Sequence, residues 1–286
     1  MPPSILRSIS IRTWEQLHGI AGEATLLSQF ARAVNIMVAD HLVALVLPEI
    51  GDGPFHVVVD ALPAYALPHH LPVTWESNRL WLGPWCIQSQ AEPAFWNPRV
   101  AWEQLSFGSR VQSELRALVE MAAQSRDVWQ DGVILGGTAG KKHVSPLPAL
   151  EIAAKSGDAD TFVAAAVALA GWGPGLTPSG DDFLAGLMLS LWVQKGELAR
   201  PLCERIATVA LPRTTRLSGA FLQAAANGLA DARWHALLHA LTGAPGITLE
   251  QAVREVLAFG ATSGLDMLAG FLYGDLKAPL LNRWLR

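Results

Sequence analysis

The chain has 286 residues, of which 51% are hydrophobic and 16% are charged, and its formal net charge is −4. That length is enough for two domains with sizeable cores, and the slight negative charge argues against a general nucleic-acid-binding protein, which needs a basic surface. Two cysteines, Cys86 and Cys203, provide neither a disulfide framework nor a zinc site, so we expect a reduced, cytoplasmic protein.

Two further features bear on membranes and partners. The first ten residues lack the apolar core of a signal peptide, and the longest apolar run, Phe183 to Val193, is too short to span a bilayer. We therefore expect no membrane association. Because apolar residues greatly outnumber charged ones, we expect part of the surface to be covered by another subunit or by a second copy of this chain.

The N-terminal part of the chain predicts a small β-rich domain. A short helix is expected around 13–17, and β-branched and apolar runs predict strands at 33–38, 41–47, 55–59, 79–82 and 85–88. Ala39 and Asp40 join the first two of these strands as a tight hairpin turn. Five tryptophans crowd this region, at positions 75, 81, 85, 96 and 102, and we interpret them as packing for the β-rich domain.

Beyond residue 110 the apolar spacing becomes helical. Helices are expected at 111–124, 149–155, 159–170, from Asp181 onward, and at 197–211, 215–230, 231–241 and 249–259. The sequence therefore predicts an α+β protein, with a β-rich domain over 1–110 packed on a mostly α-helical domain over 111–286.

The segment from Gly171 to Gly186 reads GWGPGLTPSGDDFLAG. Its glycines and prolines predict a rigid loop with few side chains that leads into a helix N-terminus, and Ser179 with Asp182 resembles a capping box. Such a terminus exposes free N–H groups and can hold an anion. The candidate substrate-binding residues of this loop are Gly175, Thr177, Ser179 and Gly180.

A second copy of this signal lies near the C-terminus. Residues 179–186 (SGDDFLAG) match residues 263–270 (SGLDMLAG) position by position, and apolar residues at helical spacing follow both. We expect a pseudo-symmetric pair of loop–helix units that come together in space. Ser263 and Gly264 join the candidate binding residues on this basis.

The acids of both copies, Asp181, Asp182 and Asp266, are the candidate catalytic residues. Acids in the first turn of a helix also complement its dipole, and this structural role stays open for Asp182 and Asp266 taken singly. A metal site would have the three carboxylates hold a hard cation such as Mg²⁺. Since no His or Cys lies at ligand spacing beside them, zinc is not expected, and we predict no resident metal or other cofactor.

Three further stretches contain candidate anion ligands. Arg213, Thr214, Thr215 and Arg216 precede a helix and offer charge and hydroxyls to a phosphate or carboxylate, although a solvated helix entry explains them equally well. The 136–142 segment (GGTAGKK) has the composition of a phosphate loop without its full spacing, so we expect an ordinary exposed loop there. Asn35, a polar residue in an apolar strand, is a candidate for lining a site between the domains.

The run GPGLTPSGDDFLAG, followed by PRTTRLSGAFLQAAANG and GATSGLDMLAG, resembles the AllH-like family, as do Asn35–Ile36 and the 49–55 segment (EIGDGPF). The resemblance implies a subunit of oxamate carbamoyltransferase, which interconverts oxalurate and phosphate with oxamate and carbamoyl phosphate in allantoin breakdown. It implies an FdrA-like subunit and another carbamoyltransferase subunit as partners, and carbamoyl phosphate, phosphate or oxamate as the small anionic substrate.

Two other functions stay open at this point. One is a Mg²⁺-dependent hydrolase on a helical scaffold, built on Asp181, Asp182 and Asp266. The other is a non-catalytic subunit that senses an anion or acts as a scaffold, and that shows no turnover by itself.

Overall fold

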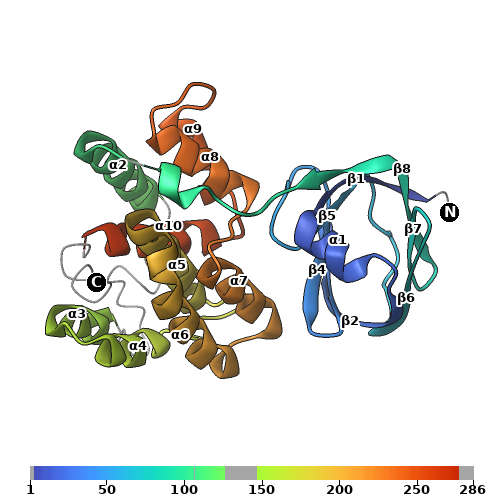
Figure 1. Ribbon diagram of the computed structural model, residues 1–286, viewed down its shortest axis with the longest axis horizontal. Helices are drawn as coiled ribbons and strands as arrows, with labels where there is room; N and C mark the ends of the chain where they lie inside the picture. The colour runs from blue at the N-terminus through green and yellow to red at the C-terminus, as the bar shows by residue number, and fades with distance from the viewer. Residues whose placement is uncertain (1–2, 106, 126–146, 277–286) are drawn as a thin grey trace. The chain divides into compact units, whose positions relative to one another are not determined.

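The computed structural model describes residues 3–105, 107–125 and 147–276 and divides into two compact units (Figure 1). The first unit comprises Met1–Arg99 with Ala230–Ala232, and the second comprises Val100–Leu229 and Arg233–Arg286. Strands make up most of the first unit and helices the second, so the predicted α+β class is confirmed.

The β-rich unit is a closed barrel of eight strands, an architecture that the sequence pattern did not predict. The strands are β1 (Ser4–Ser10), β2 (Ala21–Gln29), β3 (Ala33–Val38), β4 (His41–Val46), β5 (His56–Val59), β6 (His70–Glu76), β7 (Arg79–Leu82) and β8 (Trp85–Trp96). Their order around the barrel is β1-β5-β4-β3-β2-β6-β7-β8. Closure depends on β1, which pairs antiparallel with β5 and parallel with β8. Three strands, β1, β2 and β6, were not predicted.

Local chemistry explains the part of the barrel that was predicted. The hairpin between β3 and β4 forms as expected, with Val38 paired to His41 and Ala39 in the left-handed region at φ 51°. Aliphatic side chains such as Ile36, Leu45 and Leu71 fill the interior. Helix α1 (Ile11–Leu17) packs against this core.

In the second unit, the described residues form helices joined by loops. Its helices are α2 (Ser109–Ser125), α3 (Leu147–Ser156), α4 (Ala159–Val167), α5 (Ser179–Lys195), α6 (Arg200–Ala210), α7 (Arg216–Ala226), α8 (Ala232–Leu241), α9 (Leu249–Leu257) and α10 (Ser263–Leu276), with the short 3₁₀ segments η1 (Trp102–Gln104), η3 (Gly196–Ala199) and η4 (Leu211–Arg213). Two predicted helices end early, α4 at Val167 and α7 at Ala226. In the described residues, no helix is long and apolar enough to cross a membrane.

Helix α5 is the centre of this unit. Every residue from Ser179 to Trp192 is buried, as expected for a helix that is enclosed on all sides. It packs against α10, α7, α6 and η1, and its contact with α10 is the most extensive between any two of the described helices. The residues at the start of α5 are therefore held from several directions.

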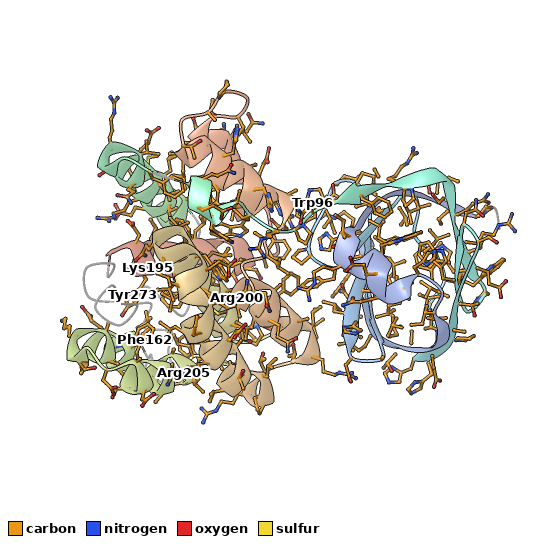
Figure 2. The ribbon with its side chains drawn as sticks, in the orientation of Figure 1. Trp96, Phe162, Lys195, Arg200, Arg205 and Tyr273 are labelled. Atoms are coloured by element: carbon orange, nitrogen blue, oxygen red, sulfur yellow. The ribbon has the colours of Figure 1, made fainter. Side chains whose placement is uncertain are left out.

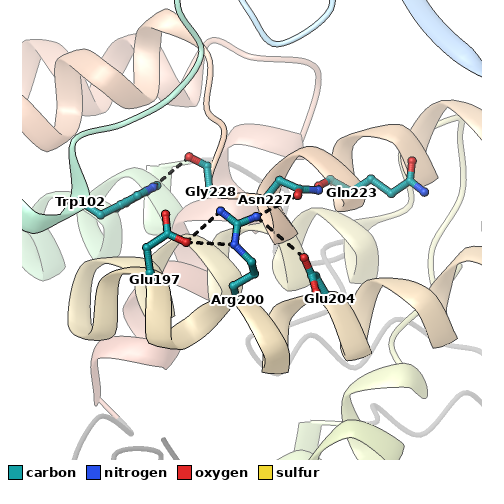
Figure 3. A network of polar contacts seen from close by, with 7 residues as sticks. All are labelled: Trp102, Glu197, Arg200, Glu204, Gln223, Asn227 and Gly228. Atoms are coloured by element: carbon teal, nitrogen blue, oxygen red, sulfur yellow. Dashed lines mark hydrogen bonds and ion pairs between the residues drawn. The ribbon is translucent and has the colours of Figure 1, made fainter. Parts of the chain in front are cut away.

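A polar network fastens the far end of α5 to its neighbours. Arg200, at the start of α6 (Figure 2), lies over the Trp192 ring, with 5.0 Å to the ring centroid. Its guanidinium forms ion pairs with Glu197 and Glu204 (Figure 3). Trp102 stacks on Trp192 with 5.8 Å between ring centroids. Our interpretation of Trp102 as packing for the β-rich domain was wrong, because its ring is buried in the helical unit.

Candidate functional site

The N-termini of α5 and α10 meet through a reciprocal pair of contacts. Ser179, the first residue of α5, is hydrogen-bonded to Asp266 of α10. Ser263, the first residue of α10, is hydrogen-bonded to Asp182 of α5. The hydroxyl oxygens of Thr177 and Ser263 also lie 3.1 Å apart in a hydrogen bond. The two similar segments of the sequence thus exchange their serine–aspartate contacts in space.

Below these contacts, two glycines allow the helix backbones to approach. A Cβ at Gly186 would lie 1.8 Å from the carbonyl oxygen of Met267, and a Cβ at Gly270 would lie 1.9 Å from the carbonyl oxygen of Phe183. Both distances are far below van der Waals contact, so only glycine fits at either position. These contacts are reciprocal as well, and they indicate an approximate two-fold relationship between α5 and α10.

The likeness extends upstream into the preceding helices. The Gly180 N–H donates to the Trp172 carbonyl at 2.8 Å, and the Gly264 N–H donates to the Phe259 carbonyl at 3.0 Å. A Cβ at Gly180 or Gly264 would collide with a carbonyl oxygen of the residues that follow α4 or of α9, respectively. The repeated unit is therefore helix, loop and helix, and the first copy has the longer loop.

Asp182 and Asp266 are the two equivalent acids of this junction, and both are 5% exposed. Within the described parts of the chain, the Oδ2 atom of each is buried and has no hydrogen-bond partner. An unpaired acceptor of this kind is costly, by about 1–3 kcal/mol, and native structures rarely keep one without a reason.

Burial changes the acidity of both groups. It raises the pKa of Asp182 to about 8, against the opposing effect of the Ser263 hydrogen bond, and the charges of Asp266 and Asp181 add to the rise. Burial also raises the pKa of Asp266 to about 6, because the hydrogen bonds from Ser179 and Thr262 offset less than the desolvation. At neutral pH the junction therefore holds one protonated and one ionised carboxyl group. Such a pair suits acid–base chemistry.

Asp181 has a different environment, although it adjoins Asp182 in the sequence. Its Oδ1 accepts from the Gly171 N–H at 2.9 Å, and its Oδ2 accepts from the hydroxyls of Ser218, at 2.9 Å, and Thr214. Both oxygens are engaged by protein donors, and the side chain is 1% exposed. Asp181 therefore joins the start of α5 to the start of α7 and fixes the position of Asp182.

The expectation of free N–H groups at the α5 terminus was wrong for three residues. The N–H groups of Asp181 and Asp182 donate to the Pro178 carbonyl, and that of Gly180 donates to Trp172. The expected capping box does not form either: Pro178 is the N-cap residue, and no side chain caps the helix. The Ser179 hydroxyl contacts Asp266 instead. The junction therefore offers carboxyl groups where free backbone N–H groups were expected.

The other predicted binding residues lie mainly along the adjoining loop. Thr215 caps α7 by accepting from the Ser218 N–H, and its hydroxyl donates to the Leu176 carbonyl at 2.6 Å. This contact ties the α7 start to the exposed loop that contains Gly175. Arg213 and Arg216 flank the α7 start, and both are exposed. Among the described residues neither guanidinium forms an ion pair.

Three earlier predictions fall outside this junction. Asn35 lies in the barrel unit, where its side-chain amide donates to the Ser28 hydroxyl at 2.9 Å. The 136–142 segment lies outside the described residues. For a metal, the structure offers no group of three or more His, Cys, Asp or Glu side chains in its described parts.

Two contributors were not predicted from the sequence. Thr262 is hydrogen-bonded to Asp266, and the Gly171 N–H holds Asp181. The position of Thr262 directly before the second serine was the available signal, because Thr at a helix start commonly bonds to groups in the first turn. For Gly171 the sequence contained no such signal.

Comparison with protein families identifies the same part of the chain. Residues 169–275 match the family described as oxamate carbamoyltransferase subunit AllH. The matched segment contains α5, α7 and all but the last residue of α10, and hence the whole serine–aspartate junction. The resemblance to the AllH-like family that the sequence motifs suggested is thereby confirmed for this segment. No solved structure matches the chain.

Proposed function

We propose that this chain is a subunit of an oxamate carbamoyltransferase and that the α5–α10 junction contributes to its carbamoyl-transfer site. One observation carries the proposal: both buried acids, Asp182 and Asp266, lie within the segment 169–275 that matches the family. An acid pair with separated pKa values, in a segment that characterises the family, is a candidate catalytic site.

The reaction needs a proton to move between two reacting groups. In the direction from oxalurate, an oxygen of hydrogen phosphate attacks the carbamoyl carbon, and the bond from that carbon to the amide nitrogen breaks. The products are carbamoyl phosphate and oxamate. Phosphate loses one proton in this step, and the departing nitrogen gains one, so a base and an acid are both required.

The junction supplies one group for each role. Asp266, ionised at neutral pH, accepts the proton of the attacking phosphate, and Asp182, protonated at neutral pH, donates a proton to the departing nitrogen. Return of the proton from Asp266 to Asp182 restores the starting state. The roles exchange when the reaction runs from oxamate.

Charge for the anionic groups is available at the start of α7. Arg213 and Arg216 are exposed, and Thr215 between them is hydrogen-bonded to Leu176 in the loop before α5. Guanidinium groups match the geometry of carboxylate and phosphate groups. In this proposal they bind the charged end of the substrate, and the acid pair faces the nitrogen. The FdrA-like and other subunits complete the assembly.

The test is the assembled complex with altered junction residues. We expect Asp182→Asn and Asp266→Asn to lower the rate of oxamate carbamoylation by about 10²- to 10⁴-fold, the usual contribution of acid–base groups. Glu250→Gln, an exposed first-turn acid of α9, is the control and should keep the full rate. Full activity in both folded Asp variants would remove catalysis from this junction and leave a scaffolding or anion-sensing role. Activity abolished by chelation would favour the Mg²⁺ alternative.

A further inference from the structure

The two halves of the junction bring two corresponding carboxyl groups near each other. Ser179 contacts Asp266 and Ser263 contacts Asp182, so each carboxyl group is held by the opposite helix. The Thr177 hydroxyl is bonded to that of Ser263, which brings the loop before α5 onto the start of α10. An approximate two-fold relationship therefore places a buried carboxyl group on either side of the junction.

Among the described residues, one oxygen of each carboxyl group is buried and has no hydrogen-bond partner. These atoms are Oδ2 of Asp182 and Oδ2 of Asp266, and both residues are 5% exposed. A ligand that donates a hydrogen bond to the ionised group and accepts one from the protonated group would recover the free energy that an unpaired buried polar atom costs.

The protein's own donors in this region are already committed. The hydroxyls of Ser179, Thr262 and Ser263 bond to the acids, and the N–H groups of Gly180 and Asp182 bond to backbone carbonyls. An anionic oxygen that carries no proton would meet the charged Asp266 carboxylate here, and such like-charge contact is strongly unfavourable. The acid pair thus opposes a carboxylate group, whereas the O–H of hydrogen phosphate can still donate to Asp266.

We infer that the Asp182–Asp266 pair is a specificity determinant that binds a primary amide or ureido group and rejects a carboxylate at the same place. A planar –CO–NH₂ group offers an N–H donor to one carboxyl group and a C=O acceptor to the O–H of the other. Oxamate and oxalurate both contain such a group, and this assignment to a natural substrate rests on the proposed function. The preference for N–H over oxygen does not depend on it.

Oxamate and oxalate form a matched pair of probes, because oxalate replaces the amide NH₂ by a carboxylate oxygen. Calorimetric titration of the assembled complex at pH 7, without carbamoyl phosphate, should give at least 100-fold tighter binding of oxamate, since a site built to hydrogen-bond an N–H group strongly rejects the analogue without it. Asp266→Asn supplies a side-chain NH₂ and should reduce the ratio of the oxamate affinity to the oxalate affinity to less than tenfold. Glu250→Gln should leave the ratio unchanged.

Each outcome decides between the alternatives. Equal or tighter binding of oxalate to the unaltered complex overturns the inference and indicates an anion site, and this measurement needs no variant to fold. An unchanged ratio in folded Asp266→Asn places the selectivity elsewhere and also overturns it. A third outcome separates the inference from the proposed function. If the unaltered complex prefers oxamate but catalyses no carbamoyl transfer, and Asp266→Asn abolishes the preference, the inference stands and the proposed function fails. If the complex transfers the carbamoyl group but does not prefer oxamate over oxalate, the proposed function stands and the inference fails.

Discussion

Gly186 of α5 lies directly against the carbonyl oxygen of Met267 on α10, so closely that an added Cβ would be 1.8 Å from that oxygen. The obstacle is backbone and cannot rotate away as a side-chain tip could. The two helices can therefore hold their serines and acids together only while this position has no side chain.

Gly186→Ala should consequently destabilise the helical unit. We expect a loss of about 3 kcal/mol, at the upper end of the cost of overpacking a core, and Gly270→Ala should behave alike because its Cβ would meet the Phe183 carbonyl oxygen at 1.9 Å. Gly108→Ala is the matched control, since nothing lies within 4 Å of a Cβ there. Urea-unfolding midpoints measure the difference, and similar midpoints for Gly186→Ala and Gly108→Ala would contradict the close approach.

Asp181 should prove to be a positioning residue. Asp181→Ala leaves the Gly171 N–H and the hydroxyls of Thr214 and Ser218 without their acceptor, and we expect a loss of roughly 2–4 kcal/mol from three unpaired donors in a buried site. Ser218→Ala removes one of these bonds and should cost about 1 kcal/mol.

The readout that separates positioning from catalysis is the shape of the rate profile. Asp181→Asn keeps an acceptor oxygen and the side-chain size but removes a charge that raises the pKa of Asp182. It should therefore lower the rate of the complex and move the falling limb of the pH profile to lower pH, with both limbs still present. Loss of either limb in that variant would give Asp181 a direct part in the proton transfer.

The raised pKa of Asp182 predicts a dependence of stability on pH. In the unfolded chain this group ionises near its ordinary value of 3.8, whereas in the folded protein it stays protonated to about 8. The contribution of Asp182 to stability is therefore fully present below pH 4 and is lost as the pH rises to about 8. The loss is about 1.4 kcal/mol for each unit by which the folded pKa exceeds the unfolded pKa. Asp266 adds to the loss only up to about pH 6.

The interval from pH 6 to 8 therefore isolates Asp182. Asp182→Asn should make the urea midpoint nearly constant across it. Asp266→Asn should keep a decline that ends at a lower pH than in the wild type, because the charge of Asp266 no longer raises the pKa of Asp182. If the wild-type protein shows no decline in that interval, the Asp182 carboxyl group is not protonated in the folded state at neutral pH.

Sequence reasoning succeeded where the determinants are local. The Ala39 hairpin, the strand at 79–82 and most helices follow from turn chemistry and apolar spacing over a few residues. The barrel could not be predicted in this way, because its closure depends on β1 pairing with β5 and β8, far away in the sequence.

The candidate site shows the same division. The repeat of SGxD and small residues predicted that two loop–helix units form a pair, and the Thr177–Ser263 hydrogen bond joins them. The distinct environments of the neighbouring acids could not be predicted. Asp181 is satisfied by groups from Gly171, Thr214 and Ser218, whereas Asp182 faces the opposite helix. Only the packing of three helices decides which acid retains a free oxygen.

The acid pair also predicts how the rate of the assembled enzyme depends on pH. In the direction from oxalurate, the productive state has Asp266 ionised and Asp182 protonated, so kcat/KM for oxalurate should rise through about pH 6 and fall through about pH 8. These two values belong to the interacting pair as a whole. Asp182→Asn cannot lose a proton and should remove the falling limb at a much lower overall rate, while Asp266→Asn should remove the rising limb. A profile that is level from pH 5.5 to 8.5, with Glu250→Gln as the control, would exclude this pair from the proton transfer.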